Sequence, residues 1–286
     1  MNVYNKARNP RIKCWNLPKR ENMLKNFLTT LLNSEHKTRV LTAITLILAL
    51  VVIFSINKMF IIWLTLGGLF IVSIYESLCL YKIESQLHFY LASVAIWLGA
   101  YITDNVANVF YPALIVLMIY AAYLSYTKNI SPKTFFPFIY PTLPFLALLA
   151  LYMQHDRLGL ICLIVIVACT DTAAYFGGKA FGKTPFCPTS PKKTIEGVVV
   201  GIFAGGIVGS ILLIGFTPNF FLSVLYSFLI AISSVFGDLF ESYLKREAEL
   251  KDSGTLFPGH GGVLDRLDAV LFGGVTMLFL LSLYEI

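Results

Sequence analysis

Long apolar stretches run through most of the chain, and they constrain its fold more than any other feature. A transmembrane helix needs about 20 mostly apolar residues, with a range of about 17–25. Apolar residues make up 57% of the chain and charged residues only 13%, whereas soluble domains are nearer about 45–50% and 25%. This composition excludes a soluble globular protein and a disordered one. The sequence predicts an all-α, polytopic integral membrane protein with about nine transmembrane helices, near 40–56, 59–80, 87–102, 106–126, 134–153, 158–177, 195–215, 220–243 and 264–284.

The basic residues predict the orientation of these helices. With a cytoplasmic N-terminus and nine alternating spans, every Lys and Arg except Lys58 and Arg157 falls on the cytoplasmic side, as the positive-inside rule requires. The fifth stretch is the least regular, because Pro137, Pro141 and Pro144 are expected to kink or break it.

Three regions are expected along the chain. We expect a basic cytoplasmic arm over residues 1–39 and the N-terminal transmembrane helices over residues 40–160. We expect a C-terminal transmembrane catalytic region over residues 161–286. The arm suits attachment to anionic lipid, and nucleic-acid binding is disfavoured because no motif accompanies the charge. A cleavable signal peptide is not expected, because the first apolar run begins only near Val40. The five cysteines show neither metal-ligand spacing nor a disulfide framework.

Acidic residues within the apolar stretches are the clearest sign of chemistry, because charges inside a membrane are costly. On the eighth stretch, Asp238, Glu241, Ser242 and Lys245 have the spacing of one helical face. The ninth stretch opens with Asp265 and Asp268, again on one face, and the intervening hairpin returns both faces to one membrane depth. Such carboxylates suit a hard divalent cation; salt bridges that only join the helix ends are the alternative. Glu76 and Asp171 also lie near cytoplasmic helix ends, and for Glu76 an interfacial carboxylate reaching water is an equally good interpretation.

Two polar loops, 178–194 and 244–263, flank these acids. The run Pro258-Gly259-His260-Gly261-Gly262 precedes the ninth stretch, and its glycines allow close backbone approach to a phosphate at a helix N-terminus. His260 suits acid–base chemistry or, more commonly, a phosphate contact. The other loop contains Ser190, Lys192 and Lys193, which suit a multi-phosphate ligand. Positive-inside bias alone would explain lysines here, but it does not explain Asp171, Ser190 or Glu196.

Taken together, these stretches resemble the phosphatidate cytidylyltransferase (CDP-diacylglycerol synthase) family. The resemblance covers residues 168–268. It is carried by the segments Asp171–Tyr175, Ser190-Pro191-Lys192-Lys193-Thr194, Glu196-Gly197, Gly237–Glu241, Ser242-Tyr243-Leu244-Lys245-Arg246, Lys251-Asp252, His260-Gly261-Gly262 and Asp265-Arg266-Leu267-Asp268. The sequence departs from the family pattern in two places. Thr189 stands where the family more often has an aliphatic residue, and the basic arm is long. Both departures bear on substrate preference.

The resemblance implies that CTP and phosphatidate react to give CDP-diacylglycerol and pyrophosphate in phospholipid biosynthesis. It also implies a need for Mg²⁺, with a second, monovalent cation as an additional candidate. The lipid phosphate would attack the α-phosphorus of CTP without a covalent enzyme intermediate. The family also implies a homodimer. A bacterial inner membrane is the expected location, with the active site facing the cytoplasm, where the nucleotide is found. The expected partners are CTP, phosphatidate and membrane lipid, and not nucleic acid.

By matching positions, the resemblance implies roles for individual residues. Asp238 and Asp265 are the expected Mg²⁺ ligands. The expected catalytic group is Asp238, Asp265, Asp268, Lys245, Arg246 and His260. The expected substrate-binding group is Asp171, Ser190, Lys192, Lys193, Glu196, Glu241, Ser242, Lys251, Gly261, Gly262 and Arg266.

Two other function classes stay open from the sequence. A CTP-dependent polyprenol or phytol kinase would transfer the γ-phosphoryl group to an alcohol, but the complete C-terminal signature favours the cytidylyltransferase. A transporter would place its site near the bilayer midplane and often contains repeats, whereas the charges here gather at one face and no repeat is evident. A scaffolding protein would not need this arrangement of carboxylates.

Overall fold

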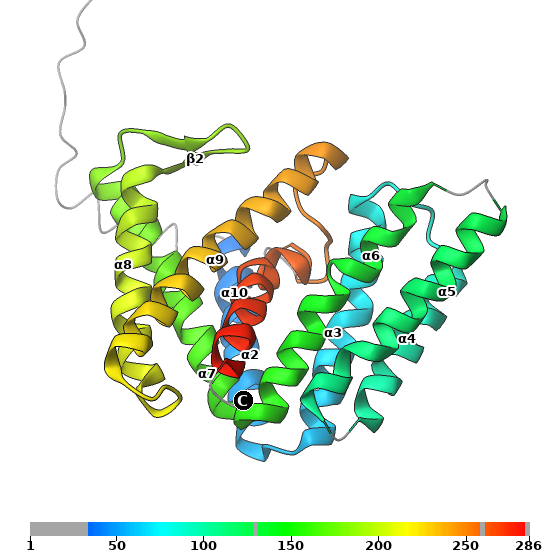
Figure 1. Ribbon diagram of the computed structural model, residues 1–286. Helices are drawn as coiled ribbons and strands as arrows, with labels where there is room; N and C mark the ends of the chain where they lie inside the picture. The colour runs from blue at the N-terminus through cyan, green and yellow to red at the C-terminus, as the bar shows by residue number, and fades with distance from the viewer. Residues whose placement is uncertain (1–33, 104, 128–130, 258–260, 284–286) are drawn as a thin grey trace, which may run out of the picture.

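The computed structural model describes residues 34–103, 105–127, 131–257 and 261–283, with side chains described from residue 40 onward (Figure 1). The described part of the chain is a helical bundle with one short β-hairpin at one end. Its α-helices are α2 (Ser34–Ile56), α3 (Met59–Leu80), α4 (Leu87–Ile102), α5 (Tyr111–Thr127), α6 (Phe136–Ile139), α7 (Thr142–Phe181), α8 (Ile195–Leu212), α9 (Phe220–Ala248) and α10 (Leu264–Ser282). Its strands are β1 (Pro185–Cys187) and β2 (Ser190–Thr194), and short 3-10 helices are η1 (Val106–Phe110), η2 (Pro132–Phe135) and η3 (Leu213–Gly215).

The described helices lie on the apolar stretches that the sequence indicates. Five helical segments are long and apolar enough to cross a membrane: Met59–Leu80, Val106–Thr127, Pro132–Phe181, Ile195–Gly215 and Phe220–Ala248. The helical class is therefore confirmed, and five such segments are consistent with a polytopic membrane protein. The number of nine spans and the cytoplasmic N-terminus stay predictions, and most of the basic arm lies outside the described residues.

The long helix α7 consists of two antiparallel halves. Asp156 interrupts it with a positive φ of 56°, and its carboxylate accepts a hydrogen bond from Asn57, just before α3 (2.9 Å). The first half lies against α3, because Tyr81 at the other end of α3 donates to the carbonyl of Tyr140 (3.3 Å). In the second half, Cys162 lies beside Leu212 at the end of α8. The two halves correspond to the expected fifth and sixth stretches, with Asp156 between them. The domain boundary expected at residue 160 falls inside this helix and stays a prediction.

The three prolines of the fifth stretch mark helix starts. Pro137 lies in the first turn of the short helix α6, Pro141 is the N-cap of α7, and Pro144 lies near the start of α7. Proline is tolerated there because the first N–H groups of a helix have no intrahelical partner. The stretch is therefore broken between α6 and α7, as expected.

Glycines at intervals of four residues pack α8 against α7. A Cβ atom on Gly201 would lie 2.6 Å from the carbonyl oxygen of Thr170, and one on Gly197 would lie 2.6 Å from that of Ala174. Small residues at this spacing let two membrane helices approach closely. This contact places the second half of α7 directly beside the strand–helix connection that follows the hairpin.

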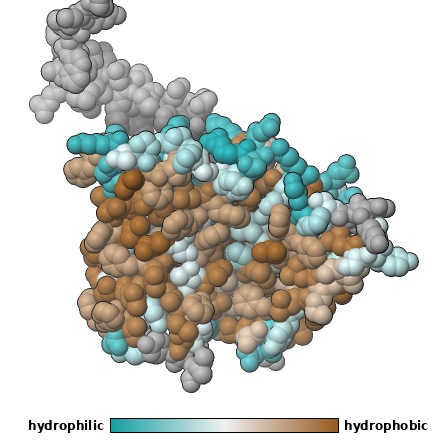
Figure 2. All heavy atoms as spheres, turned by 45° about the horizontal axis from the view of Figure 1, so that its top comes forward, coloured by the Kyte–Doolittle hydropathy of each residue, from teal (hydrophilic) through white to brown (hydrophobic). Residues whose placement is uncertain are grey.

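The two ends of the bundle differ in polarity. The hairpin, the end of α9 and the start of α10 lie at one end, which we call the hairpin end (Figure 1). Figure 2 shows hydrophilic residues gathered at this end and a broad hydrophobic belt along the sides. Exposed apolar side chains such as Leu91, Ile115, Phe203 and Phe279 contribute to this lateral surface, as expected for helices that face lipid.

In the part of the chain that the structure describes, the β-hairpin is the main departure from the all-α prediction. Pro185 pairs with Thr194 and Cys187 pairs with Ser190 in the antiparallel ladder. Prolines are tolerated on strands of this kind because each strand has a free edge. The lysines and prolines of the hairpin are typical of a loop, and its strands have no alternating apolar pattern. The hairpin was therefore not expected from the sequence.

Candidate active site

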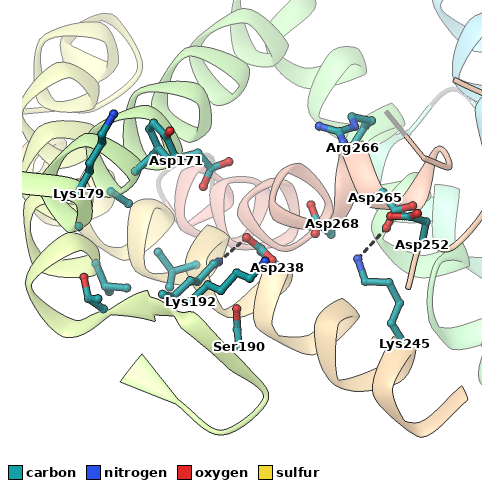
Figure 3. A pocket seen from close by; sticks show the side chains of 17 residues that line it. Asp171, Lys179, Ser190, Lys192, Asp238, Lys245, Asp252, Asp265, Arg266 and Asp268 are labelled. Atoms are coloured by element: carbon teal, nitrogen blue, oxygen red, sulfur yellow. Dashed lines mark hydrogen bonds and ion pairs between the residues drawn. The ribbon is translucent and has the colours of Figure 1, made fainter. Parts of the chain in front are cut away.

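A polar cavity of about 790 Å³ opens at the hairpin end. It lies between the second half of α7, the β-hairpin, α9 and the start of α10 (Figure 3). Basic and acidic side chains contribute to its wall in equal numbers. The lining residues are Asp171, Ala174, Tyr175, Gly178, Lys179, Ser190, Lys192, Lys193, Thr194, Val198, Val235, Asp238, Lys245, Asp252, Asp265, Arg266 and Asp268.

Asp238 joins α9 to the hairpin at the middle of this cavity. Its carboxylate forms an ion pair with Lys193 of β2 and accepts a hydrogen bond from Ser242, one turn along α9 (3.4 Å). The Asp238 side chain is 30% exposed. The carboxylate is therefore accessible from the cavity and is held in place by two neighbouring groups.

Asp265, in the first turn of α10, is held more rigidly. Its Oδ2 atom accepts hydrogen bonds from the backbone N–H of Ser253 (2.8 Å), the hydroxyl of Ser253 (3.0 Å) and the backbone N–H of Gly262 (2.8 Å). Its Oδ1 atom accepts from Lys245 Nζ (2.6 Å). With its side chain only 6% exposed, Asp265 has one oxygen fixed by the preceding loop and the other facing a lysine of the cavity.

The glycines before α10 allow this loop to approach Asp265. Gly261 has a φ of +83°, and a Cβ atom there would lie 2.6 Å from Asp265 Oδ2. A side chain at this position would therefore be disfavoured both by backbone conformation and by contact with the carboxylate.

The base of the hairpin is closed by Glu196, in the first turn of α8. Its carboxylate accepts hydrogen bonds from the backbone N–H groups of Lys183 (3.1 Å) and Thr184 (3.2 Å) and from the hydroxyl of Thr184 (3.0 Å). Glu196 does not line the cavity. Its contacts fix the path of the hairpin that carries Lys192 and Lys193.

Most residues expected from the sequence meet in this cavity. Nine of them line it: Asp171, Ser190, Lys192, Lys193, Asp238, Lys245, Asp265, Arg266 and Asp268. Ser242 and Gly262 donate hydrogen bonds to its carboxylates, and an added Cβ atom on Gly261 would lie against Asp265. Buried Glu241 lies 3.5 Å from Lys245 Nζ. Arg246 and Lys251 are exposed outside the lining, and His260 lies outside the described residues.

The cavity also contains residues that the sequence-based site did not include. Tyr175 and Lys179 follow Asp171 at intervals of one helical turn, so they lie on the same helical face as Asp171. This spacing could have predicted from the sequence that they share its site. Asp252 is the neighbour of Lys251 in the loop before α10. Outside the lining, Ser253 contacts both Asp265 and Glu76. No local pattern in the sequence connects Glu76 with Ser253.

Carboxylates are the groups in this cavity that could hold a metal ion. Among the described residues, no group of three or more His, Cys, Asp or Glu side chains is close enough to hold one alone. Asp238 and Asp265 nevertheless face the same cavity, and Mg²⁺ commonly takes one or two carboxylates together with substrate phosphates. The donor set therefore fits Mg²⁺ shared with a phosphate ligand better than a closed protein cage.

An apolar pocket of about 410 Å³ lies beside the polar cavity, and Arg266 contributes to the walls of both. Its remaining wall comes from α2, α3, α7, α10 and the loop before α10, through side chains such as Leu50, Leu69, Leu163 and Leu267. A hydrophobic pocket and a charged one thus meet at Arg266.

Comparison with known proteins shows the family of this chain. The model of the cytidylyltransferase family matches residues 37–284. A phosphatidate cytidylyltransferase of Helicobacter pylori strain J99 is 40% identical over 253 residues, which is 88% of this chain and 94% of the relative. A chloroplastic phosphatidate cytidylyltransferase 4 of Arabidopsis thaliana is 48% identical over 126 residues, covering 42% of this chain and 32% of the relative.

The match with the family model spans the helices that build both pockets, from α2 to α10. The Helicobacter pylori relative is matched over nearly its whole length. This chain therefore belongs to the cytidylyltransferase family.

Proposed function

We propose that this protein is a phosphatidate cytidylyltransferase, which converts CTP and phosphatidate into CDP-diacylglycerol and pyrophosphate. The observation that carries the proposal is the meeting of a charged cavity with an apolar pocket at Arg266. One substrate is a soluble, highly charged nucleotide and the other a membrane lipid with a phosphate headgroup. An enzyme that joins them needs two such compartments in contact.

The basic side chains of the cavity suit the triphosphate of CTP. Lys179, Lys192 and Lys193 come from α7 and β2, and lysine binds phosphate as a mobile point charge. In the described arrangement Lys193 is paired with Asp238. We infer that the nucleotide phosphates replace Asp238 as the partner of this lysine when CTP binds.

Mg²⁺ is the cofactor that the acidic side chains would hold, through Asp238 and Asp265. When bound, it would neutralise phosphate charge and favour departure of pyrophosphate. Asp268, next along the same face of α10, would support this pair, and a monovalent cation beside Mg²⁺ stays a prediction.

The reaction exchanges one phosphorus–oxygen bond for another. An oxygen of the lipid phosphate attacks the α-phosphorus of CTP, and the bond from that phosphorus to the oxygen bridging to the β-phosphate breaks. Pyrophosphate leaves with the electron pair of that bond. The side chains of the cavity hold the two phosphates in line and offset their charge, which are the main contributions of a protein to such transfers.

The apolar pocket is the proposed site for acyl chains of phosphatidate. Its wall is almost entirely apolar apart from Arg266 and Thr65. Acyl methylenes gain about 0.8 kcal/mol each on burial in such surroundings, while Arg266 suits the lipid phosphate by bidentate hydrogen bonding. We further propose a homodimer in a bacterial inner membrane with the hairpin end in the cytoplasm, where CTP is available.

Label transfer tests the reaction directly. The purified protein would be incubated with phosphatidate, Mg²⁺ and CTP that carries ³²P at either the α- or the γ-position. The proposal predicts label in the lipid product only from the α-position. Label entering an alcohol acceptor from the γ-position would instead identify a lipid kinase, and no transfer from either position would contradict both enzymes.

A further inference from the structure

Glu76 is a buried acid from the N-terminal half of the chain that contacts the loop before α10. It lies near the end of α3 and is only 2% exposed. Its Oε1 atom accepts a hydrogen bond from the backbone N–H of Val263 (2.9 Å), and its Oε2 atom accepts one from that of Leu264 (2.8 Å). The carboxylate therefore satisfies N–H groups at the start of α10, which would otherwise lack partners.

Ser253 connects Glu76 to Asp265. The Ser253 hydroxyl lies 3.1 Å from Glu76 Oε2 and 3.0 Å from Asp265 Oδ2. The backbone N–H of the same serine donates to Asp265 (2.8 Å). The hydroxyl has one hydrogen, which it can donate to either carboxylate, while its backbone N–H stays bonded to Asp265. We therefore expect a shift of Glu76 to be transmitted through Ser253 to Asp265.

The packing around Glu76 leaves little room for another arrangement. A Cβ atom on Gly254 or on Gly262 would collide with the Glu76 carboxylate. The loop backbone therefore lies directly against this side chain on two sides. Glu76 itself is buried and does not line the polar cavity, so the role that the geometry supports acts through its neighbours.

We propose that Glu76 is a positioning residue for the transfer reaction. Its carboxylate fixes the loop and the first turn of α10, so that Asp265 and Arg266 face the cavity. This makes α3 part of the catalytic unit, although the residues that resemble the family signature all lie between 168 and 268. The activity arm of the test rests on the proposed function, whereas the structural arm does not.

The structural arm compares Glu76→Gln with the wild-type protein by hydrogen–deuterium exchange. Glutamine keeps the size of the side chain but loses the charge and replaces one acceptor oxygen with an NH₂ group. We expect faster exchange confined to peptides covering 253–266. Glu84→Gln is the matched control, because Glu84 follows α3 and is exposed. Unchanged exchange in Glu76→Gln, or faster exchange throughout the bundle, would overturn the positioning role.

The activity arm measures kcat and KM per folded protein. Loss of a group that orients a metal ligand costs about 10- to 100-fold in activity or metal affinity, so kcat should fall by about that factor in Glu76→Gln while KM for phosphatidate changes little. Half-maximal activity should also require more Mg²⁺. Glu76→Asp should recover part of the loss, and adding Ser253→Ala to Glu76→Gln should cost less than the separate effects combined.

The outcomes separate the two proposals. If the wild-type protein transfers no α-label, the proposed function fails, and hydrogen exchange still decides whether Glu76 holds the loop. If the wild-type protein is active and Glu76→Gln matches it in kcat and Mg²⁺ dependence, the positioning role is wrong. A fall in protein yield with unchanged kcat would also contradict it, because a purely structural residue would behave in that way.

Discussion

Asp265 is the cavity carboxylate whose orientation is most completely determined by its neighbours. It accepts hydrogen bonds from Ser253, Gly262 and Lys245 at 2.6–3.0 Å. Replacement of its side chain by an amide would keep the shape, remove the negative charge and place an NH₂ group against N–H donors. Asp265 is therefore the most informative single position in the cavity.

We expect Asp265→Asn to lower cytidylyl transfer by at least about 100-fold, the scale seen when one group that stabilises a transition state is lost. The measurement is α-label transfer by membranes that contain equal amounts of folded protein. Glu247→Gln makes the same charge change at an exposed position on α9 and should retain activity. Near-normal transfer by Asp265→Asn would remove Asp265 from the proposed metal site.

Gly261 offers a second test at the residue scale. Its positive φ costs an L-residue about 1–2 kcal/mol, and an added Cβ would press on Asp265 Oδ2. Gly261→Ala should therefore reduce kcat while the protein still inserts into membranes. Gly215→Ala is the control, because nothing lies within 4 Å of an added Cβ there. Equal kcat values for both variants would show that the loop tolerates a different backbone conformation.

The sequence identified many of the cavity residues because they lie on helix faces or in short motifs. Asp238, Ser242 and Lys245 share one face of α9, and Asp265 and Asp268 share one face of α10, so local spacing was sufficient to group them. Glu76 was recognisable as an acid in an apolar stretch, but its partners are Val263 and Leu264. A contact over that separation depends on the packing of the whole bundle, which no local pattern encodes.

Among the elements, α8 brings the two sides of the site together. Its glycines pack against α7, which carries Asp171, and its first turn follows the hairpin, which carries Lys193. A larger side chain between these helices would move the lysines away from the acids. The effect on activity would then arise from displacement of whole elements.

We expect Gly201→Leu to destabilise the protein by about 1–3 kcal/mol, as overpacking of a close contact commonly does, and to lower transfer activity. Thermal unfolding in detergent and α-label transfer are the two measurements. Gly68→Leu on α3 is the matched control, because a Cβ there meets nothing within 4 Å. If the two variants unfold at the same temperature, close packing of α7 and α8 is not important for stability.

The elements differ in how well the sequence predicted them. Helices followed from apolar stretches of membrane-spanning length. The break at Pro141 falls inside the fifth stretch, where its prolines predicted one, and the break at Asp156 falls between the fifth and sixth stretches. The hairpin was missed, because two short strands held together partly by Glu196 have no apolar alternation. The glycine contact of α8 was not predicted, because the helix against which these glycines pack depends on the folded bundle.

At the scale of the whole molecule, polarity is distributed in a way that fits a membrane orientation. The polar cavity, the hairpin and most described lysines lie at the hairpin end, whereas Lys58 lies beside the start of α3 at the opposite end. The hydrophobic belt between them matches the lateral surface of a membrane protein (Figure 2). The positive-inside rule then predicts that the hairpin end lies in the cytoplasm, as proposed above.

Cysteine labelling in intact cells tests this orientation. Ser85→Cys lies after α3 at the hairpin end, and Pro218→Cys lies before α9 at the opposite end; both positions are exposed. Each substitution is made in a chain whose own five cysteines are replaced by serine. A membrane-impermeant maleimide should label Pro218→Cys in intact cells and Ser85→Cys only after the membrane is permeabilised.

The cysteine-free chain without either substitution supplies the background, and α-label transfer verifies that each variant remains folded. The reverse labelling pattern would place the polar cavity outside the cytoplasm, away from the supply of CTP. The proposed reaction would then be untenable in cells even if the purified protein performed it. Orientation therefore bears on function as directly as the carboxylates do, because a nucleotide site is useful only on the side of the membrane that holds the nucleotide.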